Sequence, residues 1–149
     1  MNSQNFTTTF SVGQTPEEAF AAINNVRGWW TGEVEGSTDK VGDEFTYRYP
    51  DAHYSKQQIT ELVPSQRVVW RVVDSHLAGP EDPSEWTGTE ISFDVSSKDG
   101  QTEVRFAHQG LVPEFECFDS CSSAWGFYIN GSLRRLIVTG EGPATPPWA

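Results

Sequence analysis

The sequence predicts an α+β fold in which a curved antiparallel sheet wraps around one long C-terminal helix. Residues 16–28 and 116–139 carry apolar side chains at helical spacing, one segment towards each end of the chain. Six segments between them have the alternating or β-branched composition of strands. Turn signals separate these segments, and short turns favour antiparallel neighbours.

The N-terminal part predicts one strand followed by one or two short helices. Residues 5–12 read as a strand that places Phe6 and Phe10 on one face. Thr15 suits a helix N-cap and Pro16 suits the first helical position. Gly28 is expected to end this helical region.

The middle of the chain predicts the rest of the sheet. The candidate strands are 33–37, 43–50, 53–63, 66–73, 87–95 and 102–109. The segment 33–37 is the weakest and reads as an edge strand, whereas 53–63 is long and polar. Asp99-Gly100 is a strong hairpin signal between the last two strands.

The C-terminal segment predicts a long amphipathic helix. Its stripe consists of Phe115, Phe118, Ser122, Trp125, Ile129, Leu133 and Leu136. Gly140 is expected to end the helix, which would span about 116–139. One face of this helix is therefore available to the concave side of the sheet.

Length and charge limit the classes of function. The 149 residues suit one domain, with a core at about 5–140 and an extended tail at 141–149. The net charge of −11 disfavours nucleic acid and anionic membranes as partners. The chain shows neither an apolar run of about 20 residues nor a secretion signal, so we expect a cytoplasmic protein.

The order of these elements resembles the START/Bet v 1-like superfamily, also called SRPBCC, and its helix-grip fold. Within it, the chain is similar to the family related to the activator of Hsp90 ATPase. The resemblance covers about residues 6–140 and is carried by phrases in a fixed order. They are "TPEEAFAAI", "GWWTGEVEGS", "VGDEFTYRY", "ITELVPSQRVVWRV", "TEISFDV", "GQTEVRFAHQGL" and "SAWGFYINGSLRRLIVTGEG".

The resemblance implies a cavity between the sheet and the C-terminal helix that holds a small hydrophobic or aromatic molecule. It leaves three functions open: a binding protein, an enzyme of the cyclase or dehydratase type, and a module that associates with an Hsp90-type chaperone. We prefer binding without catalysis and expect no cofactor. The activator itself has a further N-terminal domain, and its motif is echoed at 23–30 only by chance, so we rank the chaperone role third.

The expected ligand contacts are aromatic side chains on inward faces of the strands and on the helix. They are Trp30, Phe45, Tyr47, Trp70, Phe93, Phe106, His108, Phe118, Trp125 and Tyr128. Simple core packing is the alternative for each ring. The enzyme alternative would use His108 and a tyrosine as acid and base, whereas the alternative for His108 is a buried, singly hydrogen-bonded histidine.

The two cysteines predict neither a metal site nor a redox centre. Cys117 and Cys121 are four residues apart on the predicted helix, and none of the three histidines has motif spacing to them. We expect thiols that are buried or half-buried beside the apolar stripe. Trp148 in the tail could dock on a second copy, so a homodimer is a further expectation.

Overall fold

A sheet of antiparallel strands forms the frame of the molecule in the computed structural model, which describes residues 5–30, 33–49, 53–77, 84–112 and 118–141. The strands are β1 (Phe6–Val12), β2 (Glu33–Gly36), β3 (Glu44–Tyr49), β4 (His53–Val63), β5 (Arg67–Leu77), β6 (Glu90–Lys98) and β7 (Gln101–Gln109). They form one seven-stranded sheet in the order β1-β7-β6-β5-β4-β3-β2. β1 and β2 are therefore its two edges.

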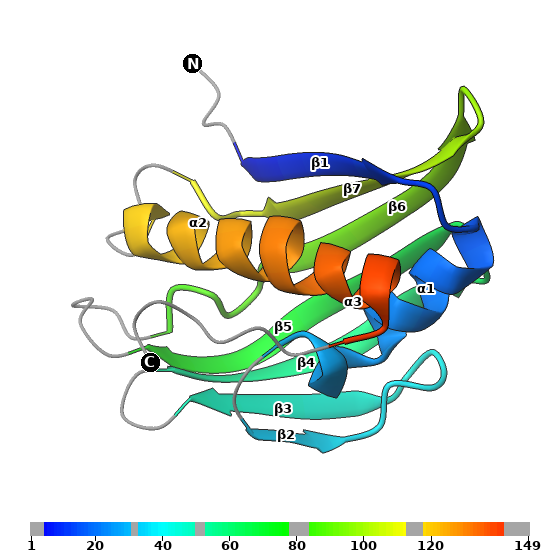
Figure 1. The fold of residues 1–149 in the computed structure, drawn as a ribbon. Helices are drawn as coiled ribbons and strands as arrows, with labels where there is room; N and C mark the ends of the chain where they lie inside the picture. The colour runs from blue at the N-terminus through cyan, green and yellow to red at the C-terminus, as the bar shows by residue number, and fades with distance from the viewer. Residues whose placement is uncertain (1–4, 31–32, 50–52, 78–83, 113–117, 142–149) are drawn as a thin grey trace.

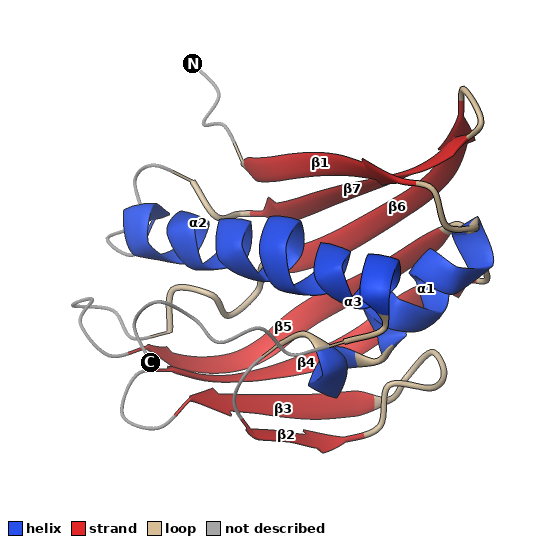
Figure 2. Cartoon of the chain, in the orientation of Figure 1, coloured by secondary structure: helices blue, strands red, loops and turns tan. Residues whose placement is uncertain are grey.

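The helices lie together on one face of this sheet (Figures 1 and 2). They are α1 (Pro16–Asn24), the 3₁₀ turn η1 (Val26–Gly28), α2 (Phe118–Gly126), the π-helical segment η2 (Phe127–Leu133) and α3 (Arg134–Thr139). α2, η2 and α3 follow one another without interruption and form a single rod along the concave face of the sheet. This arrangement confirms the predicted α+β fold, the helix-grip arrangement in which the sheet wraps around a C-terminal helix.

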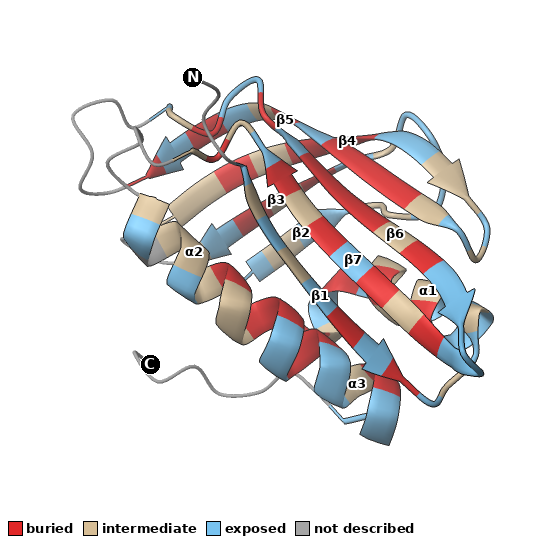
Figure 3. Ribbon diagram, turned by 90° about the horizontal axis from the view of Figure 1, so that it is seen from above, coloured by how far each residue is buried: buried red, intermediate tan, exposed pale blue. Residues whose placement is uncertain are grey.

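The strand sequences decide which face of the sheet meets the rod. On β7, buried Thr102, Val104, Phe106 and His108 alternate with more exposed residues. Figure 3 shows the same alternation of buried and more exposed residues along the strands, and the buried side of the rod faces the sheet. Because successive side chains of a strand point to opposite faces, this pattern places one face of the sheet in the core.

The first helical region ends at Gly28 as expected, but it consists of two separate pieces. Thr15 is the N-cap, as predicted, and it forms a capping box with Glu18. The α-helix ends at Asn24, however, and Gly28 ends a separate 3₁₀ turn. Asn25 takes φ −84° and ψ 66°, which is outside the helical region and breaks the hydrogen-bond ladder between the two pieces.

The strand expected at 87–95 begins only at Glu90. Thr87 and Thr89 instead belong to a turn, in which their amides donate to the carbonyls of Ser84 and Trp86. Gly88 has φ +90°, a conformation that interrupts an extended strand. Thr89 thus lies before the regular strand, although its carbonyl still accepts a hydrogen bond from the Val72 amide of β5, and its side chain is buried in the interior.

The C-terminal helix is confirmed, but it is not α-helical throughout. Its middle seven residues, Phe127–Leu133, form a π-helix, which has a wider turn than an α-helix. The wider turn rotates the residues that follow, so Ile137 is buried in the core and the predicted Leu136 is only partly buried. Two further predictions, the tail after residue 141 and Cys117, lie outside the described residues.

Candidate functional site

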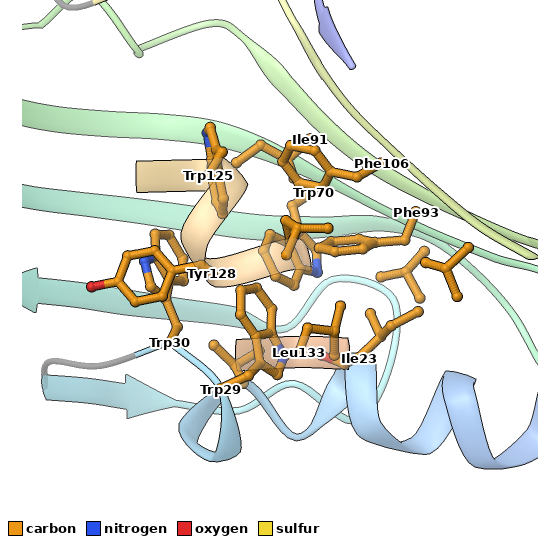
Figure 4. Packing of buried hydrophobic residues seen from close by; sticks show 14 of the residues in the cluster. Ile23, Trp29, Trp30, Trp70, Ile91, Phe93, Phe106, Trp125, Tyr128 and Leu133 are labelled. Atoms are coloured by element: carbon orange, nitrogen blue, oxygen red, sulfur yellow. Dashed lines mark hydrogen bonds between the residues drawn. The ribbon is translucent and has the colours of Figure 1, made fainter. Parts of the chain in front are cut away.

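Ten aromatic side chains meet between the sheet and the rod. This ring cluster comprises Trp29, Trp30, Phe45, Tyr47, Trp70, Trp86, Phe93, Phe106, Trp125 and Tyr128, each at most 3% exposed. Figure 4 shows members from the sheet, from the rod and from the segment after η1 pointing towards one another. The cluster is thus assembled from parts of the chain that are far apart in sequence.

Trp30 lies at the middle of one half of the ring cluster. Its indole stacks on Tyr47 of β3 with centroids 3.8 Å apart and planes 10° apart. It lies parallel to Trp70 of β5 at 6.3 Å and is tilted against Trp125 of the rod at 5.1 Å. Nearly parallel ring faces suit flat aromatic groups, because offset stacking is their preferred packing.

Trp125 connects Trp30 and its neighbours to the other rings of the cluster. It stacks on Trp86 at 5.6 Å and meets Phe106 of β7 at 4.7 Å. Tyr128, three residues further along the rod, brings its hydroxyl to 3.5 Å from that of Tyr47. The N-terminal half of the rod therefore presents its aromatic residues to both sides of the cluster.

Trp29 is a buried ring that the expected contacts leave out. Only Trp30 of this pair is expected inside, because adjacent residues on a regular element face opposite sides. Both are buried, because they follow the 3₁₀ turn and precede β2, where the backbone is not regular. The two indoles stack at 5.8 Å, and the Trp29 indole also donates to the Ile23 carbonyl.

His108 is held by hydrogen bonds on both ring nitrogens, one more than expected. The Trp125 indole N–H donates to Nδ1 at 3.0 Å, and Nε2 lies 2.8 Å from Thr89 Oγ1. Because Nδ1 accepts, the proton of the neutral ring is on Nε2 and is donated to Thr89. The Thr89 hydroxyl in turn donates to the Trp86 carbonyl at 2.6 Å.

This network keeps His108 uncharged. Burial, with a smaller contribution from His53, lowers the pKa of His108 to about 3. A proton on Nδ1 would also point at the Trp125 N–H, so protonation breaks an existing bond. As a base, His108 would first have to lose the Trp125 bond at Nδ1, and as an acid it would have to release Thr89 at Nε2. The geometry therefore favours a positioning role.

The inward face of β4 carries a polar strip of His53, Ser55 and Gln57. Ser55 and Gln57 are fully buried, at 0% exposed. The Gln57 amide donates to Ser55 Oγ, which lies 2.9 Å from His53 Nε2. A register shift between Lys56 and Gln57 bends the β4–β5 pair at this point.

His53 links the polar strip to the ring cluster. Its ring lies edge-on to Trp86 at 4.5 Å and to Tyr47 at 5.1 Å. Burial lowers the pKa of His53 to about 3, so this histidine is also neutral at pH 7. Among the buried side chains of the described residues, none belongs to Asp, Glu, Lys or Arg.

Three buried polar atoms of the cluster and the strip have no hydrogen-bond partner within the described residues. They are Gln57 Oε1, Trp70 Nε1 and Trp86 Nε1. Leaving a buried polar group unpaired costs about 1–3 kcal/mol. Natural structures pair most such groups, so these atoms call for a physical explanation.

The structure brings together nearly all of the residues that the sequence suggests for the site. Nine of the ten are buried, and Phe118 at the start of α2 is partly buried against the same core. Sequence reasoning left out His53, Ser55, Gln57 and Thr89. The alternation of His53, Ser55, Gln57 and Ile59 along the strand was the available signal, because it matches the face of Phe45 and Tyr47 on the preceding strand.

The remaining candidates add no second centre of chemistry. Cys121 is half-buried and packs against the hydrophobic core. Across the described ranges, no three His, Cys, Asp or Glu side chains group as metal ligands would. None of the described helices is long and apolar enough to span a membrane.

A solvent-open hollow of about 440 Å³ lies on the opposite face of the sheet. Its walls come from β1, β6 and β7, and they include short side chains such as Thr7, Ser92 and Ala107 beside Asp94 and Arg105. No aromatic side chain lines it. The interior cluster, which combines rings with unpaired polar atoms, is the better candidate for a site.

Comparison with known proteins identifies the family and supports the fold. The sequence model of the family described as activator of Hsp90 ATPase homolog 1-like protein matches residues 15–137. The solution structure of the Aha1 dimer from Colwellia psychrerythraea superposes with a TM-score of 0.75 and 27% identity, covering 93% of this chain and 99% of that one. A sequence search of curated proteins finds no match.

Two more distant structures share the fold. The protein MLL2253 from Mesorhizobium loti has a TM-score of 0.72 and 14% identity, with 90% of this chain and 96% of that chain covered. DynU16, a protein of the dynemicin biosynthetic locus, has a TM-score of 0.69 and 15% identity, with 94% of this chain and 49% of that chain covered. At such identities the likeness concerns architecture alone.

Proposed function

Because the chain belongs to the family of activator of Hsp90 ATPase homolog 1-like proteins, we propose that it binds a small apolar or aromatic molecule between the sheet and the C-terminal rod, in the cytoplasm. The observation that carries the proposal is the set of unpaired polar atoms on Gln57, Trp70 and Trp86 within a cluster of rings. A bound molecule would give these atoms partners. It would stack on the rings at the same time.

The composition of the cluster supports this function. Ligand sites in proteins are mostly apolar and aromatic, with a few placed polar groups that fix orientation. Trp30, Tyr47 and Trp125 pack against one another as an aromatic layer, and the polar strip supplies hydrogen-bonding atoms beside it. A core that served packing alone would gain stability if these polar groups were replaced by apolar ones.

A neutral fluorescent probe tests the proposal. We expect N-phenyl-1-naphthylamine to bind with saturable fluorescence enhancement and to raise the melting temperature of the protein. Tyr128→Leu, at a buried ring of the cluster, should weaken binding severalfold. Phe127→Leu is the matched control, because this neighbouring ring is only partly buried. Absence of saturable binding, or equal weakening by both variants, would reject the proposal.

A chaperone-linked role is a second candidate, because the family name and the Aha1 relative at 27% identity both point to it. It would use an outer surface of the protein rather than the ring cluster. Stimulation of an Hsp90-type ATPase by the purified protein, with binding seen in a pull-down, would support this role. An unchanged ATPase rate together with no pull-down would remove it.

Homodimerisation is a related proposal. The relative from Colwellia psychrerythraea is described as a dimer, and it matches this chain along almost its whole length. With a net charge of −11 on each chain, association should strengthen as salt screens the repulsion. Sedimentation at low and at physiological ionic strength tests this, and a monomer under both conditions at high protein concentration would contradict it.

The enzyme alternative receives least support. A cyclase or dehydratase in the same interior would need an acid and a base that can exchange protons. His108 has both nitrogens engaged, and the buried part of the described structure supplies no carboxylate to work with it. We therefore rank binding above catalysis.

A further inference from the structure

We infer that the ligand is an uncharged planar molecule carrying both a hydrogen-bond acceptor and a donor, selected by Trp70 and Gln57. This inference rests on the proposed binding function and makes it more specific. It assigns a role to two side chains that neither the family nor the ring cluster by itself would single out.

Gln57 and Trp70 are neighbours on the inner face of the sheet. Gln57 pairs across the strands with Phe45 on one side and Val72 on the other, while Trp70 pairs with Ile59. The two residues are therefore diagonal neighbours, a distance that long and aromatic side chains can span. Trp70 also meets Phe45 edge-on at 4.9 Å, so both residues border the same ring.

The unpaired atoms are complementary. Trp70 Nε1 can only donate, and Gln57 Oε1 can only accept. They do not bond to each other, and both residues are 0% exposed. A group that accepts from the indole and donates to the amide oxygen would satisfy both, whereas a purely apolar ligand would leave both unpaired.

Trp86 provides a second unpaired donor towards the other end of the polar strip, next to His53. From Gln57 to His53 the strand rises about 13 Å, at roughly 3.3 Å per residue. A second acceptor at the far end of the ligand could therefore meet the Trp86 indole.

The charge of the interior excludes ionic ligands. No buried side chain among the described residues is a Lys, Arg, Asp or Glu, and both nearby histidines are neutral at pH 7. A carboxylate or an ammonium group would thus lose its hydration without gaining an opposite charge. Fatty acids and other organic anions are expected to bind poorly, even where their apolar part would fit.

Three naphthalene probes of similar size test the inference by calorimetry: 2-naphthamide, 2-naphthoate and 2-ethylnaphthalene. The amide carries an acceptor and a donor, the carboxylate has nearly the same shape with a charge, and the ethyl compound has neither. We expect the naphthoate to bind at least about tenfold more weakly than the amide.

Variants of Gln57 and Trp70 test whether these side chains produce the preference for the amide probe. The affinity ratio of the amide to the ethyl compound should fall about tenfold in Gln57→Leu and in Trp70→Phe, because each removes one hydrogen-bond partner. Gln58→Leu is the matched control, since Gln58 lies on the opposite face of the same strand, and it should leave the ratio unchanged. If Gln57→Leu fails to fold by circular dichroism, Trp70→Phe carries the test, because it keeps an aromatic ring.

The outcomes separate the two proposals. Equal binding of naphthoate and amide, or a ratio unaffected by both inner variants, would overturn the inference and leave ligand binding intact. A buried water bridging Trp70 and Gln57 would produce that second result. Binding of N-phenyl-1-naphthylamine but of none of the three probes would also overturn the inference alone. Failure of all four compounds would reject the proposed function with it.

Discussion

At the scale of single residues, His108 shows how the interior fixes its polar groups. Trp125 donates to one ring nitrogen, and Thr89 receives the proton of the other. The imidazole therefore has one tautomer and one orientation. Its position between β7 and the rod connects the sheet to the helix that the sheet grips.

The two buried histidines predict a loss of stability in acid. Their folded pKa values of about 3 lie below the ordinary value of 6.5. Between these values the unfolded chain binds protons that the folded protein does not, so stability is full above pH 6.5 and falls as the pH drops towards 3. The slope should be about 1.4 kcal/mol per pH unit for each such histidine.

Chemical denaturation between pH 7.5 and pH 4.5 measures this slope. Both histidines should contribute to the slope, because their folded pKa values lie at the same low level of about 3. His108→Gln should flatten the pH dependence, whereas His76→Gln, at an exposed position on β5, should leave it unchanged. An equal slope in all three proteins would contradict the assignment.

The indole N–H groups of Trp125 and Trp70 form a natural comparison. Replacement of either residue by Phe removes ring volume and an N–H, but only Trp125 uses its N–H in a hydrogen bond. Trp125→Phe leaves His108 Nδ1 buried and unpaired, so it should cost about 1–3 kcal/mol more in unfolding free energy than Trp70→Phe. Urea unfolding measures both, and equal losses would argue against the network.

At the scale of elements, the rod is the part that the sequence describes least completely. Its length and its apolar face follow from the spacing of Phe118, Trp125 and Leu133. The π-helical middle does not, because a pattern of steps of three and four tolerates one wider turn. π-helical turns are rare and occur frequently at functional sites, and this one places Tyr128 and Ile129 side by side in the core.

Two glycines of the rod predict opposite effects of the same substitution. Gly131 lies inside η2, and a Cβ there would meet only a Phe127 ring atom at 3.9 Å, an ordinary contact. Gly131→Ala should therefore stabilise the protein by about 0.5–1 kcal/mol through backbone entropy. Gly140 has φ +77° at the end of α3, so Gly140→Ala should destabilise by about 1 kcal/mol or more.

Thermal unfolding of the two variants measures this pair of effects. Because a Cβ at Gly140 would meet nothing within 4 Å, its expected loss reflects backbone conformation alone. A destabilising Gly131→Ala would mean that the π-helical turn itself requires the glycine.

In the sheet, too, the sequence predicts some features of the strands and not others. Alternating apolar residues predicted β3 and β7 closely, and Asp99-Gly100 located the hairpin turn between β6 and β7. The start of β6 was wrong because Thr89 has good strand propensity but is held in a turn by its hydroxyl bond to the Trp86 carbonyl. Local patterns do not contain such tertiary hydrogen bonds.

At the scale of the whole molecule, the fold and the family follow from sequence order, whereas the composition of the interior does not. The rings of Trp30, Tyr47 and Trp125 were expected inside, but their mutual stacking depends on elements distant in the chain. The polar strip on β4 was missed because its inward side chains look like those of an exposed strand. Only the pairing with β3 and β5 turns them inward.

Native mass spectrometry of the purified protein tests the central claim most directly. The account predicts a population of folded chains that carry one small molecule, which is released on denaturation and proves to be uncharged, with at least one acceptor and one donor. An anionic ligand such as a fatty acid would contradict the inferred chemistry while supporting a binding function. Folded chains that carry no molecule under gentle conditions, and that also bind none of the aromatic probes, would contradict the binding function itself.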